Sequence, residues 1–131
     1  MKRIIAFILT SITLATASLH AERVKGFESH PSGNVLAMTV DSIDYRKDLT
    51  RVYGSLTGRP HTSARIDGAT LDGMECTDIE GVDLNRYFQW EDEGRIGVEI
   101  DFPPVAPKRQ GTIVLKTPRG ESPIVFSRTG R

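Results

Sequence analysis

The clearest alternation of hydrophobic and polar positions runs through residues 96–102, which read IGVEIDF. Successive side chains of a β-strand point to opposite faces, so this segment presents one apolar face and one polar face. We therefore predict a half-buried strand here, ended by the dipeptide Pro103-Pro104.

Shorter segments with the same strand character recur along the chain between turn signals. They are residues 36–40, 50–56, 65–66, 74–77, 112–115 and 123–127. Asp67-Gly68 and Asp72-Gly73 are turn dipeptides, and residues 118–121 are predicted to close a hairpin between the last two strands. The pattern is typical of many short strands joined by tight turns.

Residues 83–91 allow more than one interpretation. Leu84, Tyr87 and Phe88 have the spacing of one face of a helix, and Asp83 is of a type that caps helix starts. A single helical turn, an aromatic-bearing loop and a strand all remain open for this segment.

About seven to eight short strands are thus predicted, spaced about 8–12 residues apart in about 110 residues. This size and spacing favour an all-β fold, an immunoglobulin-like antiparallel β-sandwich. In such a fold each strand buries its apolar face against a second sheet. A barrel is the alternative. The core of the single domain is expected to span about residues 35–127.

The first 21 residues are predicted to be a cleaved signal peptide. Lys2 and Arg3 precede an apolar run at 4–9 and a region of small residues at 15–21. A membrane anchor is the alternative, but Thr and Ser interrupt the run, and a spanning helix needs about 20 predominantly apolar residues. No Cys follows the run to carry a lipid. We therefore expect a periplasmic or secreted protein, without stable membrane insertion, whose residues 22–131 form one domain.

The charge balance changes once this segment is removed. The whole chain of 131 residues has 17 Lys and Arg against 17 Asp and Glu. Residues 1–21 hold two basic residues and no acidic one, so the remaining 110 residues carry 15 against 17, a net charge of −2. A nearly neutral chain lacks the basic surface that nucleic acid requires, so we predict no nucleic-acid partner. Anionic membrane surfaces are disfavoured for the same reason.

The chain contains one cysteine, Cys76, and so cannot form an internal disulfide. Small exported domains often depend on several disulfides, whereas this one must rely on its core. Met74 and Cys76 are expected on one face of a strand, with the thiol buried as a small hydrophobe. An intermolecular disulfide or a reactive thiol is the alternative.

Several short motifs together resemble a known kind of module. They are SIDY at 42–45, DLTRVY at 48–53, Ile66, TLDG at 70–73, GVDL at 81–84, the strand ending Phe102-Pro103-Pro104, and a closing pair around Ile113 and Ile124. Their order resembles a β-sandwich module of exported envelope proteins of Gram-negative anaerobes, often N-terminal to thioredoxin-like domains. The resemblance covers about residues 35–127 and implies a non-catalytic accessory domain. The chain has no Cys-x-x-Cys motif, so the resemblance carries no redox chemistry here.

Catalytic motifs are missing from the sequence. Only His30 and His61 offer imidazole bases after residue 21, and no Gly-x-Ser-x-Gly or phosphate loop is present. We predict that the protein is not an enzyme. The alternative is a small hydrolase in which His61 is the base for Ser63 or Cys76.

Metal-binding motifs are also missing, and we predict no metal and no cofactor. Cys76, His30 and His61 lack the spacing of a zinc site. A calcium-dependent protein is the alternative, because residues 91–93 are all acidic and Asp78, Glu80 and Asp83 form a second acidic group.

Binding is the function that these observations favour. Tyr87, Phe88 and Trp90 lie within four positions and cannot all point inward, so at least one is expected at the surface, where aromatic rings anchor recognition. The alternative is that the rings close one end of the sandwich. Arg59 and His61 lie in a second candidate loop, residues 59–63.

We therefore predict an exported, non-catalytic binding or accessory module of the cell envelope. Its partner is expected to be an envelope protein or a second copy of the chain. The alternative of a self-associating structural subunit follows from the ability of sheet edges to pair between chains.

Overall fold

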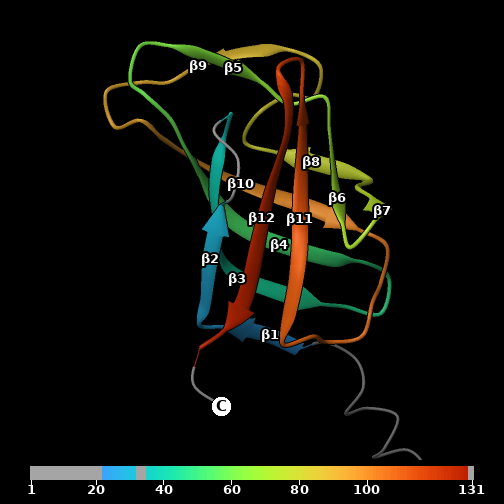
Figure 1. Cartoon of the computed structure of the whole chain (residues 1–131). Coiled ribbons are helices and arrows are strands. Elements are labelled where there is room, and N and C mark those ends of the chain that lie inside the picture. Colours follow the sequence, from blue (N-terminus) through green and yellow to red (C-terminus); the bar gives the residue numbers. More distant parts are fainter. Residues whose placement is uncertain (1–21, 32–34, 130–131) are drawn as a thin grey trace, which may run out of the picture.

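The structure is a computed structural model that describes residues 22–31 and 35–129 (Figure 1). Two five-stranded antiparallel sheets and one two-stranded ribbon make up this part of the chain. The first sheet has the order β1 (Glu22–Lys25), β3 (Ala37–Tyr45), β4 (Thr50–Thr57), β10 (Arg95–Phe102) and β8 (Asp78–Glu80). The second has the order β2 (Phe27–Pro31), β12 (Gly120–Arg128), β11 (Gln110–Thr117), β6 (Gly68–Leu71) and β7 (Met74–Glu75). The ribbon consists of β5 (Ser63–Arg65) and β9 (Tyr87–Gln89).

The two sheets pack face to face, and the strands of the second run across those of the first in Figure 1. The core lies between them. Val52 and Ile100 contribute fully buried side chains from the first sheet, and Ile113, Leu115 and Ile124 from the second. In β11 and β12, buried positions alternate with more exposed ones, as a half-buried sheet requires. The structure confirms the prediction of an all-β fold in which two antiparallel sheets pack together.

The predicted signal peptide, residues 1–21, lies outside the described residues. Over the ranges that are described, no helix has the length and apolar character needed to cross a membrane.

The number of strands differs from the expectation of seven to eight, because the described residues form 12. The sequence did not predict β1 and β2, which are short and carry few apolar residues. Val24 is nevertheless buried, and the Phe27 ring lies 5.5 Å from that of Phe126. The core therefore begins before residue 35. Gly26, at a φ of 81°, is the point where the chain passes from the first sheet to the second.

The turn predictions had mixed outcomes. Asp72 and Gly73 both have positive φ, as a two-residue hairpin turn requires, and they join β6 to β7. Residues 118–119 join β11 to β12 as expected. The prediction of a turn at Asp67-Gly68 was wrong, because Gly68 begins β6 and pairs with Lys116. Residues 83–91 form no helical turn, and β9 is a strand.

The polar face of β10 is less exposed than its pattern suggested. Asp101 is only 8% exposed, and its carboxylate accepts hydrogen bonds of 2.7 and 2.9 Å from Arg51 on β4. The register places Arg23, Asp44, Arg51 and Asp101 side by side on four neighbouring strands. Opposite charges on adjacent strands stabilise this pairing.

Ser122 is a polar residue buried in the core. It is fully buried on β12, and its Oγ has no hydrogen-bond partner in the described structure. Burying an unpaired hydroxyl is unfavourable. We expect Ser122→Ala to raise the free energy of unfolding by about 1 kcal/mol, measured by chemical denaturation. Ser127→Ala, a partly exposed position on the same strand, should change it by less than about 0.5 kcal/mol. A destabilised Ser122→Ala protein would show that the hydroxyl has a partner.

Candidate functional site

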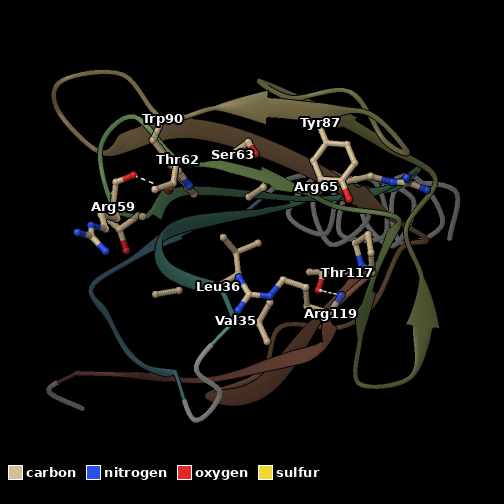
Figure 2. A pocket seen from close by; sticks show the side chains of 15 residues that line it. Val35, Leu36, Arg59, Thr62, Ser63, Arg65, Tyr87, Trp90, Thr117 and Arg119 are labelled. Atoms are coloured by element: carbon tan, nitrogen blue, oxygen red, sulfur yellow. Dashed lines mark hydrogen bonds between the residues drawn. The ribbon is translucent and has the colours of Figure 1, made fainter.

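A cavity of about 450 Å³, called here the end cavity, lies at the end of the sandwich where the β5–β9 ribbon stands (Figure 2). Four segments far apart in the sequence line it. They are the two residues before β3 with its first residue, the end of β4 with the following loop, the ribbon with the residue after it, and the turn between β11 and β12. The site therefore exists only in the folded protein.

Part of the end cavity is apolar. In Figure 2, Val35 and Leu36 form an apolar wall on the side of Arg119, and Trp90 lies across from them beside Thr62. Trp90 is only 2% exposed. The Trp90 backbone is bound to the loop before β5, since its N–H donates to Thr62 at 2.8 Å and its carbonyl accepts from His61 at 2.9 Å. The indole ring lies directly against the α-carbon of Gly58, where a β-carbon would clash with it. Glycine at that position thus permits the ring to close the end of the sandwich.

Three arginines give the cavity its charge. Arg59, Arg65 and Arg119 line it, and none of its lining residues is acidic. Arg65 is paired with Asp67 at 2.6 Å, and its guanidinium carbon lies 5.5 Å from the centre of the Tyr87 ring. The guanidinium groups of Arg59 and Arg119 make no ion pair with another described residue. Two of the three arginines therefore remain available to an anion.

Local hydrogen bonds hold the segments that carry these two arginines. Thr62 Oγ1 donates to the Arg59 carbonyl at 2.7 Å, and the Arg119 N–H donates to Thr117 Oγ1 at 3.1 Å. Thr117 Oγ1 in turn donates to the Gly120 carbonyl at 2.7 Å. Both loops have a defined backbone before any ligand enters, which lowers the entropic cost of binding.

The predicted aromatic residues occupy three different environments. Tyr87 is 65% exposed at the cavity rim, which confirms that at least one of the three rings lies at the surface. Phe88 is partly buried outside the lining, with its ring 5.3 Å from that of Trp90. Trp90 belongs to the core, as in the alternative in which rings close the end of the sandwich. The end cavity thus brings together Tyr87, Trp90 and Arg59, but not Phe88 or His61.

His61 and Cys76 are not among the residues that line the end cavity. His61 is exposed, and its Nε2 lies 3.1 Å from Asp92, which is also exposed. Among the described residues no hydrogen bond joins His61 to Ser63 or Cys76. Cys76 is half-buried against the core, and burial raises the pKa of its thiol. A raised pKa lowers the thiolate fraction at neutral pH and hence the reactivity.

The two acidic groups considered as calcium ligands, residues 91–93 and the trio Asp78, Glu80 and Asp83, do not form a metal site in the described part of the chain. Residues 22–31 and 35–129 contain no group of three or more His, Cys, Asp or Glu side chains placed to hold a metal ion. Asp92, from the acidic loop at 91–93, instead faces His61.

Sequence reasoning missed several lining residues. Arg119 was predicted only as part of a hairpin turn, and Arg65 only as part of a short strand. No local pattern could have identified them, because they join the site through the approach of the β11–β12 turn to the ribbon.

Comparisons with protein-family models, with curated proteins and with solved structures give no match to this chain. Function is therefore inferred from the chemistry of the end cavity.

Proposed function

We propose that the protein is an exported, non-catalytic binding module of the cell envelope and that the end cavity holds an organic anion. The observation that carries this proposal is a cavity lined by three arginines and no acidic residue, next to an apolar wall. Guanidinium groups bind carboxylate and phosphate oxygens through paired N–H donors. The apolar wall then suits the uncharged part of the same ligand.

Two further features support binding rather than catalysis. A volume of about 450 Å³ is within the usual range for small-molecule sites. The residues that line the cavity include no His, Asp or Glu, the usual general acids and bases, so Ser63 has none of these bases beside it in the lining. The hydrolase alternative relied on His61, which lies outside the lining.

We also propose that the protein is located in the cell envelope and that it is related to the β-sandwich modules of exported proteins. The basic, apolar and small-residue pattern of residues 1–21 supports export, and the β-sandwich supports the resemblance. The immunoglobulin-like description is supported by size and antiparallel pairing. One feature differs from it, because the strands of the two sheets cross in Figure 1, whereas the sheets of an immunoglobulin-like sandwich pack nearly aligned.

Self-association through sheet edges has less support. The outer strands β7 and β8 have two and three residues, and the outer strand β2 ends in a proline. Such edges offer too few backbone groups for an extended sheet between two whole chains, and an edge proline removes one donor.

Trp90 is the only tryptophan of the chain, so its fluorescence reports directly on the end cavity. We expect a titration of the purified protein with hexanoate or benzoate to change this fluorescence, and the matched amides to change it far less. Arg59→Gln combined with Arg119→Gln should weaken binding of the acids by about tenfold or more.

Arg128→Gln is the matched control, because Arg128 lies at the opposite end of β12 from the turn that carries Arg119. It should bind the acids like the unaltered protein. Equal responses to acids and amides, or no response to either, would refute an anion site.

A further inference from the structure

The ribbon strand β5 has one edge without a partner strand. It pairs with β9 along its other edge, and the ribbon contains only these two strands. Residues of a strand direct their N–H and C=O groups alternately to its two edges. Part of the β5 backbone therefore points away from β9.

This open edge faces the end cavity. Ser63, Ala64 and Arg65 are successive residues, and all three line it. Side chains of successive strand residues point to opposite faces, so three in a row line one cavity when that cavity lies along the strand edge. In Figure 2, β5 passes along one side of the hollow, and the β11–β12 turn with Thr117 and Arg119 lies across from it.

The side chain of Arg119 spans the side of the cavity opposite β5. It extends from the turn toward Val35 and Leu36, the apolar part of the lining (Figure 2). A cationic group, an apolar wall and an open strand edge thus surround one space. Each matches a different part of a peptide end, namely the carboxylate, the last side chain and the backbone.

We propose that the ligand of the end cavity is the C-terminal end of an extended peptide, which adds a strand to the open edge of β5. Its terminal carboxylate binds Arg119, and its last side chain packs against Val35, Leu36 and Trp90. This inference rests on the proposed function of the cavity as an anion site. Strand addition with capture of a terminal carboxylate is a known way to recognise peptides.

Other anions match the cavity less completely. A sugar acid or a phosphate would use the arginines but would leave the backbone groups of β5 without a partner. An internal peptide segment would lack the carboxylate, and a site of about 450 Å³ suits a chain end better than a long segment.

The test uses N-acetylated pentapeptides of alternating valine and threonine, ending in valine, with Trp90 fluorescence and calorimetry as readouts. The free acid is expected to bind about tenfold or more tightly than the C-terminal amide. Methylation of alternate peptide nitrogens should weaken the free acid by a similar factor. Arg119→Gln should remove the preference for the acid, whereas Arg128→Gln should retain it.

The outcomes distinguish a failure of the peptide inference from a failure of the proposed anion site. Equal affinity of acid and amide, or no loss on nitrogen methylation, overturns the peptide inference. If hexanoate or benzoate binds and the peptides do not, the anion site stands and the peptide inference fails. If none of these compounds binds, both fail.

Discussion

Replacing Trp90 by alanine is expected to lower the free energy of unfolding by about 3–5 kcal/mol. Trp90 is only 2% exposed, its indole packs against Phe88 and Gly58, and it closes the end of the sandwich. Its removal leaves a large void that the ribbon and the loop after β4 cannot fill without moving. Guanidinium denaturation followed by circular dichroism measures the effect, since the variant has no tryptophan to report it.

Tyr87→Ala is the matched control for Trp90→Ala, because Tyr87 lies on the same short segment but is 65% exposed. It should change the stability by less than about 1 kcal/mol while still removing a ring from the cavity rim. Similar losses for the two variants would contradict the assignment of Trp90 to the core and Tyr87 to the surface.

Gly54→Ala is expected to destabilise the protein by about 3 kcal/mol. Gly54 lies on β4 opposite Val40, where the β3–β4 pairing shifts register between Val40 and Ser42. A β-carbon at Gly54 would clash with the backbone carbonyl oxygen of Thr39 and approach the Met38 side chain within 2.8 Å. A backbone group of a central strand cannot rotate away, so β3 and β4 would have to separate. Thermal and chemical unfolding of the purified variant test this.

Gly97→Ala provides the comparison for Gly54→Ala. Gly97 lies on β10 beside β4, and a β-carbon there would meet no atom within 4 Å. Alanine also reduces the conformational entropy of the unfolded chain, so a gain of about 0.5 kcal/mol is expected. Loss of stability in both variants would point to a general intolerance of side chains in the first sheet and against the specific contact at Thr39.

Alternation in the sequence was most informative where a strand is long and central. The pattern of residues 96–102 predicted β10 nearly to its ends, because its apolar side chains, from the partly buried Ile96 to Phe102, belong to the core or pack against it. The short edge strands β1, β2 and β8 were missed for the opposite reason. In β1, only Val24 is buried, and a single apolar residue forms no pattern.

The aromatic segment at 87–90 shows the same limit of predictions made from local sequence patterns. Tyr87, Phe88 and Trp90 were recognised together as candidates, but their exposures differ from 65% to 2%. The difference depends on the space beside Gly58, which is 29 or more positions away in the sequence. A local pattern contains no information about such a contact.

The sequence by itself determined that this protein is all-β, that it cannot depend on an internal disulfide, and that its long central strands alternate between core and surface. These properties follow from residue type and local spacing. Only the tertiary structure decided that Arg59, Arg65 and Arg119 share one cavity with Trp90. The physical reason is that the cavity forms where four segments meet at one end of two packed sheets, and their approach is set by long-range pairing and core packing.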